Sequence, residues 1–80
     1  MNVGDFVAYY DHVAIIIESF LTYESYGDSL DGEYEDSFTI KILESEFYTY
    51  GEELNVLYFA LDKITDEKEI SRLRKIMVFK

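Results

Sequence analysis

The chain has 80 residues, of which 49% are hydrophobic and 18% aromatic, and a formal net charge of −10. Its length fits one domain, residues 1–80, and the absence of cysteine excludes both a disulfide framework and a thiolate metal site. The longest apolar runs have five or six residues, far short of the ~20 that span a bilayer, and no signal-peptide pattern opens the chain. We therefore expect a soluble, cytoplasmic protein that does not bind membranes.

The charges are segregated along the chain. Residues 1–62 hold fourteen Asp and Glu but a single basic residue, Lys41, whereas residues 63–80 hold six Lys and Arg and three acidic residues. An acidic body repels nucleic acid, so we expect no direct binding to DNA or RNA. The expected partner is a protein with a basic surface. The basic end is also expected to contact the acidic body or a second copy of it, as in a homodimer, through Arg72, Arg74 and Lys75.

The first residues predict two strands. Residues 5–10 and 13–22 are rich in β-branched and aromatic side chains, and Asp11 and His12 between them predict a tight polar turn. Residues 13–17 form an apolar run bounded by polar residues, which is typical of a strand buried on both faces. We expect the rest of the fold to be organised around this pair.

A loop and a third strand follow. Residues 24–33 contain two glycines and many polar side chains, and they predict a long hairpin loop. Residues 34–44 alternate between apolar and polar positions, as a half-buried strand does. The side chains expected on the core face are Phe38, Ile40 and Ile42, and those expected on the opposite face are Ser37, Thr39 and Lys41.

The second half of the chain is less regular. Residues 47–50 are a further β-like patch, and residues 54–61 can be read as a buried strand or as a helix. Residues 66–76 predict a helix, because Asp66 is a candidate N-cap with Glu69 three residues later, and residues 77–79 could then pair as a terminal strand. The expected core consists of Val7, Ile15, Ile17, Phe38, Ile40, Ile42 and Phe59.

The opening residues resemble a family of small barrels. Two segments carry the resemblance, Gly4-Asp5-Phe6-Val7 and Ala14-Ile15-Ile16-Ile17-Glu18. They look like the first two strands of SH3-like barrels of the KOW and Tudor kind. They also look like the start of short proteins of tailed phages. Ala14 stands where such barrels usually carry Gly. The chain also lacks the Trp and Pro that mark peptide-binding SH3 grooves, which argues against a polyproline ligand. The resemblance, which covers residues 1–18, implies a five-stranded, strongly bent sheet that serves as an interaction module.

Composition and resemblance together predict a mainly β fold. We expect a small, strongly bent antiparallel sheet or an SH3-like barrel with one short C-terminal helix. No pattern predicts catalysis, a metal site or a cofactor. The acidic cluster of residues 28–36 does not have the EF-hand spacing. His12, the single histidine, has no second His and no Ser or Cys placed to be activated by it, so we expect it to be a turn residue. We therefore expect a protein that is not an enzyme.

The acidic and tyrosine-rich region of residues 23–53 predicts a protein-binding surface. Eight tyrosines are more than so small a core can bury, and tyrosine is enriched in interface hot spots, although β-propensity alone also accounts for them. The residues expected to contact a partner are Tyr26, Asp28, Asp31, Glu33, Tyr34, Glu35, Glu44, Glu46, Tyr48 and Tyr50.

Two functions follow from this surface. In the first, the chain is an inhibitor of a host or defence protein whose acidic face occupies a basic, nucleic-acid-binding groove, acting in the host cytoplasm if a phage encodes it. Glu33 with Glu35, and Glu44 with Glu46, would then mimic phosphates, because alternate strand residues lie about 6.5 Å apart, near two ~3.4 Å steps of a DNA strand. In the second, the chain is a structural or assembly adaptor that uses tyrosines and sheet edges, and its charge serves solubility.

Overall fold

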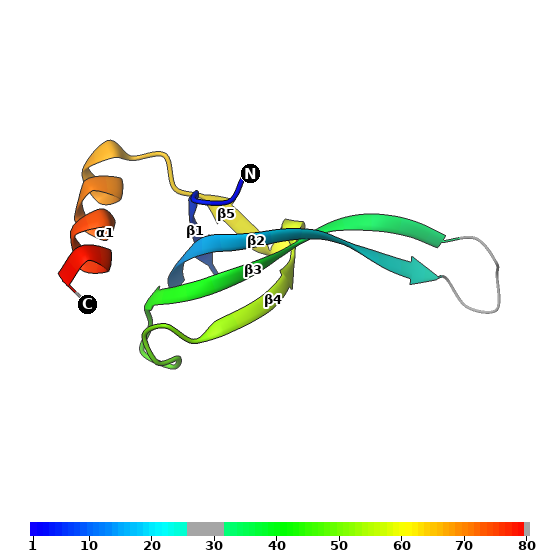
Figure 1. The fold of residues 1–80 in the computed structure, drawn as a ribbon, viewed down its shortest axis with the longest axis horizontal. Coiled ribbons are helices and arrows are strands. Elements are labelled where there is room, and N and C mark those ends of the chain that lie inside the picture. Colours follow the sequence, from blue (N-terminus) through cyan, green and yellow to red (C-terminus); the bar gives the residue numbers. More distant parts are fainter. Residues whose placement is uncertain (26–31, 80) are drawn as a thin grey trace.

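The fold is mainly β, as the sequence predicts (Figure 1). The structure, a computed structural model, describes residues 1–25 and 32–79. In these residues the chain forms an antiparallel sheet with the strand order β4-β3-β2-β1-β5. The elements are β1 (Phe6–Tyr9), β2 (His12–Ser25), β3 (Gly32–Glu44), β4 (Glu53–Leu57), the 3₁₀-helix η1 (Tyr58–Ala60), β5 (Leu61–Lys63) and the helix α1 (Glu67–Phe79).

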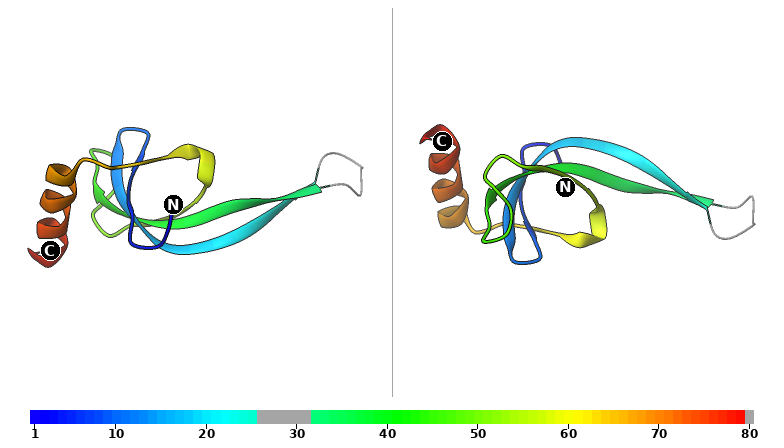
Figure 2. Two further views of the ribbon diagram at one scale, coloured as in Figure 1. Left: turned by 90° about the horizontal axis from the view of Figure 1, so that it is seen from above. Right: turned by 90° about the horizontal axis from the view of Figure 1, so that it is seen from below.

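The sheet is strongly bent, and its connectivity shows why. β4 and β5 lie at opposite edges of the sheet, yet only the three residues of η1 join them. Four strand spacings of about 4.8 Å would separate these edges by about 19 Å in a flat sheet. A 3₁₀ turn of three residues rises only about 6 Å. The sheet must therefore curl until its edges approach each other, and Figure 2 shows the short strands curving around the base of the β2–β3 hairpin.

Each face of the curled sheet buries its own cluster of apolar side chains. The inner cluster consists of Val7, Ala14, Ile16, Phe38, Ile40, Ile42 and Leu61. The outer cluster lies under α1 and consists of Phe6, Ile15, Leu43 and Leu73. Because successive strand residues point to opposite faces, β2 contributes to both clusters and is buried on both sides at Ala14, Ile15 and Ile16.

The predicted core was wrong at three positions. Ile15 belongs to the outer cluster instead of sharing a core with Ile40. Ile17 is 38% exposed, since the β2–β3 register shifts between Ile16 and Glu18 and takes Ile17 out of the ladder. Phe59 is 68% exposed because it lies on η1, at the turn that links the two edges of the sheet.

Ser37 and Thr39 lie on the face of β3 opposite Phe38 and Ile40, as predicted, but the expectation of a strand buried on one face only was wrong there. Ser37 and Thr39 are buried, and each side chain finds a polar partner on a neighbouring strand. Ser37 Oγ lies 2.7 Å from Thr22 Oγ1, and Thr39 Oγ1 donates a hydrogen bond of 2.8 Å to Asn55 Oδ1. These bonds satisfy the hydroxyl groups that burial takes from water.

Several predicted boundaries differ from the structure. The tight turn lies at Tyr10 and Asp11, where Tyr10 adopts a positive φ of 52°, and His12 already belongs to β2. Residues 47–50 form bends instead of a strand, and residues 54–61 divide into parts of β4, η1 and β5. Residues 77–79 continue α1 instead of forming a strand. β2 and β3 extend into the predicted loop of residues 24–33, as far as Ser25 and from Gly32.

The N-cap of α1 is confirmed. Asp66 Oδ1 accepts a hydrogen bond of 2.9 Å from the backbone N–H of Lys68, and the helix begins at Glu67. Glu69, which a capping box would direct back to the N-cap, instead contacts Arg72 in the next turn. Leu73, Ile70 and Ile76 then place one side of α1 against the outer face of the sheet.

Candidate protein-binding site

A two-stranded arm projects from the curled part of the sheet. β1 pairs with β2 only as far as Ile15, and β4 pairs with β3 only as far as Ser37. Within the described residues, β2 beyond Ile16 therefore pairs only with β3, and residues 32–36 of β3 pair only with β2. We call residues 17–25 and 32–36 the β2–β3 arm. The arm extends away from the other strands, at the end of the molecule opposite α1 (Figure 1). It makes the radius of gyration 14.4 Å, against about 12 Å for a compact chain of this length.

One face of the arm is aromatic and apolar. The register pairs Tyr23 with Tyr34 and Leu21 with Asp36, so these side chains share a face. The two tyrosine rings lie 5.1 Å apart between centroids, and Tyr34 and Leu21 are 68% and 61% exposed. This face continues the inner face of the sheet, since Phe38 lies on it two residues beyond Asp36. The face of the sheet that carries the inner cluster is thus the same face that carries the exposed side chains of Leu21 and Tyr34 on the arm.

The other face of the arm carries carboxylates. Glu18, Glu33 and Glu35 lie on it, together with Phe20 and Thr22. Glu33 and Glu35 are alternate residues of β3, so their side chains project on the same side about 6.6 Å apart along the strand. The arm therefore presents most of its aromatic contact area on one side, together with Asp36, and the carboxylates of Glu33 and Glu35 on the other, together with Phe20.

The predicted contact residues divide between two separate regions. Glu33, Tyr34 and Glu35 lie on the arm, whereas Tyr26, Asp28 and Asp31 lie outside the described residues. Glu44 follows Glu35 by nine positions along β3, which is about 30 Å of strand. The structure therefore does not bring all the predicted residues together. The second region, which surrounds the connection between β3 and β4, contains Glu44, Glu46, Tyr48 and Tyr50.

The predicted carboxylate row of Glu44 and Glu46 does not form. β3 ends at Glu44, and Glu46 lies in the bend that follows, so the two residues are not alternate positions of a strand. The carboxylate of Glu44 also accepts two hydrogen bonds from the guanidinium group of Arg72, with lengths of 2.8 and 2.6 Å. Glu33 and Glu35 are thus the pair that keeps the predicted strand spacing.

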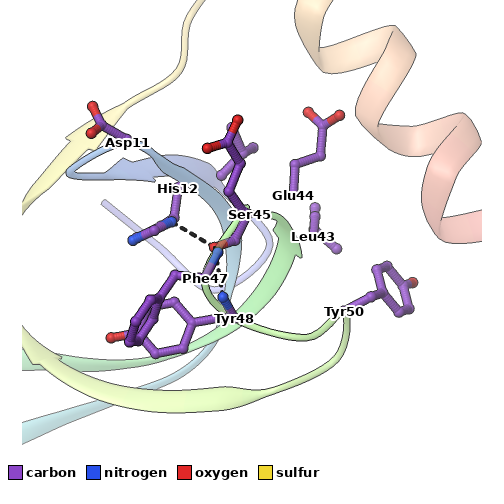
Figure 3. Close-up of a pocket in the computed structure, with 10 residues that line it drawn as sticks. Asp11, His12, Leu43, Glu44, Ser45, Phe47, Tyr48 and Tyr50 are labelled. Carbon is purple, nitrogen blue, oxygen red and sulfur yellow. Dashed lines mark hydrogen bonds between the residues drawn. The ribbon is translucent and has the colours of Figure 1, made fainter.

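A hydrogen-bonded loop forms a pocket at the second region (Figure 3). Ser45 Oγ accepts hydrogen bonds from the backbone N–H groups of Phe47 and Tyr48, at 2.9 and 2.8 Å. It also lies 2.7 Å from His12 Nδ1, within hydrogen-bonding distance. The expectation that no serine is placed beside His12 was therefore wrong, because the fold brings together two residues that are 33 positions apart in the sequence. Through these three contacts Ser45 links the loop after β3 to β2.

The aromatic residues of this region mostly pack against the protein. Tyr48 is half-buried against the inner cluster and meets the ring of His12 edge-on at 4.9 Å. Tyr50 is half-buried against the outer cluster, with Lys41 Nζ 5.6 Å from its ring centroid. Phe47 is 82% exposed and was not among the predicted contact residues. The second region therefore offers less free aromatic surface than its sequence indicates.

The basic end of the chain contacts the acidic body through Arg72, as predicted. Its guanidinium group binds Glu44 on β3 and Glu69 on α1, and these hydrogen bonds raise the pKa of Arg72. Since all three side chains are partly exposed to solvent, the contribution of this cluster to stability is modest. Within the described residues, Arg74 and Lys75 make no ion pair, so the prediction is not confirmed for them.

Leu21 is the member of the arm that sequence reasoning missed as a contact residue, because it belongs to the predicted strand of residues 13–22. Tyr23 is the first residue of the predicted binding region of residues 23–53, although it was not among the residues expected to contact a partner. The signal that could have found Leu21 is the acidic segment of residues 33–36, which pairs opposite residues 21–24 and contains no apolar residue except Tyr34.

The described residues contain no group of His, Cys, Asp and Glu side chains that could hold a metal ion. In the acidic cluster of the sequence, Asp36 lies on the opposite face of β3 from Glu33 and Glu35. No helix in the described part of the chain has the length and apolar character needed to cross a membrane. Comparison with known proteins gives no match to a protein-family model, to a curated protein or to a solved structure.

Proposed function

We propose that this chain is a non-catalytic protein-binding module that inserts the β2–β3 arm into a basic groove of another protein. The observation that carries the proposal is the arm itself. It stands clear of the sheet with Glu33 and Glu35 on one face and Leu21 and Tyr34 exposed on the other. An exposed apolar surface bordered by charge is typical of a protein-interaction site.

The two faces have different roles in binding. Carboxylates that stay near solvent steer an acidic protein toward a basic surface, so they act mainly on the association rate. Aromatic side chains that become buried act mainly on the lifetime of the complex. A groove that normally holds nucleic acid suits both faces, because it is basic and often carries planar side chains that stack on bases.

The resemblance to SH3-like barrels and phage proteins is part of the same proposal. The five-stranded, bent sheet of the described residues is what that resemblance implies, and the short η1 connection between the two edge strands supports it. An inhibitor of a host or defence protein, acting in the host cytoplasm, is the biological role that fits an acidic arm of this kind.

Charge reversal on the arm tests the proposal. A partner captured from the native host's lysate is purified, and its association with the chain is measured by surface plasmon resonance at two salt concentrations. Glu33→Lys with Glu35→Lys should slow association at least tenfold at low salt. The matched control, Glu46→Lys with Asp62→Lys, changes the net charge equally at two exposed sites away from the arm and should have a much smaller effect. Equal effects of the two pairs would show that the arm is not the contact.

Truncation of the aromatic face gives an independent measurement. Tyr34→Ala should speed dissociation and leave the association rate nearly unchanged, whereas Phe47→Ala, which removes an even more exposed ring in the second region, should alter neither rate. If the association rate were indifferent to salt while Tyr34→Ala still speeded dissociation, the alternative function would be favoured. In that case the chain would be an assembly adaptor whose charge serves solubility.

A further inference from the structure

No strand of the described residues pairs with the outer edge of β2 along the arm. β1 leaves this edge at Ile15, and the backbone hydrogen bonds between Ile16 and residues 4 and 5 are the last ones on it within the described residues. From residue 17 to residue 25, β2 pairs with β3 on one side only. This free edge is about 30 Å long, and every second residue along it directs its backbone N–H and C=O groups outward.

The free edge of β2 lacks the usual protection. Natural edge strands carry Lys, Pro or dense charge, which discourage pairing with another chain. Residues 19–23, Ser-Phe-Leu-Thr-Tyr, contain none of these and have high β-propensity. The free edge of β3 in the arm carries Glu33, Glu35 and Asp36 within four positions. Of the two edges of the arm, that of β2 is therefore the one suited to accept another strand.

We propose that this edge of β2 binds an extended segment of the partner protein as an additional antiparallel or parallel strand, and that this segment alternates basic and apolar side chains. The proposal rests on the proposed function and specifies how the same arm binds. Strand addition lets main-chain hydrogen bonds supply affinity and alternate side chains supply specificity.

The register of the arm defines the chemistry of the added strand. On one face its side chains would lie beside Leu21 and Tyr23, which suits apolar residues. On the other face they would lie beside Glu18, Phe20 and Thr22, with Glu33 and Glu35 one strand further. This suits Lys or Arg, which can pair with a carboxylate and also lie over an aromatic ring. Successive residues of a strand alternate between faces, so a basic–apolar alternation satisfies both faces at once.

A second copy of the chain fits this edge less well. Two β2 edges that pair in antiparallel fashion around Leu21 would place Glu18 of one copy opposite Glu24 of the other, at both ends of the contact. Like charges directly opposite each other destabilise a strand pair, and each copy carries a net charge of −10. The charge pattern therefore favours a basic partner.

The test uses the full chain and a capped peptide of about nine residues, the length of the free edge, in which lysine and valine alternate. Amide hydrogen exchange is followed by NMR with and without the peptide. We expect protection of every second backbone N–H of residues 17–25, and no added protection of residues 32–36. A control peptide with the same composition, but with its lysines and valines in two separate blocks, should bind at least tenfold more weakly and give no alternating protection.

Each outcome separates this inference from the proposed function. If the alternating peptide perturbs the NMR signals of Glu33 and Tyr34 without alternating protection of β2, the arm binds basic ligands and strand addition is refuted. If the block peptide binds equally well, the predicted chemistry of the added strand is wrong. If the β2 amides are already protected in the free protein and the chain sediments as a dimer, the occupant is a second copy and the proposal is overturned.

Discussion

Leu73 tests whether α1 folds together with the sheet. Its side chain is fully buried and packs with Phe6, Ile15 and Leu43 on the outer face. Leu73→Ala removes the branched end of this side chain and leaves a cavity between helix and sheet. Such replacements cost about 2–5 kcal/mol of unfolding free energy. At about 0.05–0.15 kcal/mol per residue, an 80-residue chain has a total of about 4–12 kcal/mol, so the loss should be large.

The assay is urea denaturation followed by far-ultraviolet circular dichroism and by tyrosine fluorescence. Both midpoints should fall together in Leu73→Ala. Val78→Ala is the matched control, because it shortens a side chain of the same helix that is 77% exposed, and it should change stability by no more than about 0.5 kcal/mol. If Leu73→Ala costs no more than this control, or if the helical signal melts early while the tyrosine signal does not move, α1 is not part of the cooperative unit.

Three further predictions address the inner core, a loop and a titrating tyrosine. Ile40→Ala should cost about 2–5 kcal/mol in urea denaturation, whereas Phe59→Ala should cost much less because its ring is mostly exposed; similar losses would contradict the assignment of the core. Gly51→Ala should lower stability by about 1–2 kcal/mol, since Gly51 has a φ of 88° that L-residues rarely adopt, and an unchanged thermal midpoint would argue against that loop conformation. Burial, with a smaller effect from two neighbouring tyrosines, raises the pKa of Tyr9 above its ordinary value of 10.0. Tyr9 then ionises at a lower pH in the unfolded chain than in the folded one, so the unfolding free energy should fall as the pH rises through about 10. In Tyr9→Phe the unfolding free energy should fall less steeply over the same range, and parallel pH profiles of the two proteins would refute this reading.

Patterns that repeat within a few residues were predicted well. The alternation of Phe38, Ile40 and Ile42 identified the core face of β3, and Asp66 marked the start of α1. The burial of side chains that depends on the residues of neighbouring strands was predicted poorly. The burial of Ser37 and Thr39 depends on hydroxyl and amide partners from β2 and β4, and nothing in the alternation of β3 itself indicates those partners.

The candidate site shows the same division. The mixture of acidic and aromatic residues predicted Glu33, Tyr34 and Glu35 as contact residues. The structure places all three on the arm, with Glu33 and Tyr34 exposed and Glu35 partly buried. The sequence predicted Tyr48 and Tyr50 as part of the same binding surface, because the residues around them are also acidic and aromatic. The structure instead packs both rings partly against the two apolar clusters, since the connection between β3 and β4 folds back onto the sheet.

The sequence by itself determined that this chain forms a mainly β fold with a C-terminal helix and a strongly acidic body, because propensity, alternation and charge act locally. Only the tertiary structure decided where the acids and tyrosines lie relative to one another. β1 and β4 are short, whereas β2 and β3 are long, so the far ends of β2 and β3 have no further strand beside them among residues 1–25 and 32–79. The arm and its free edge are the result of that difference in length, and strand length is set by pairing between distant parts of the chain.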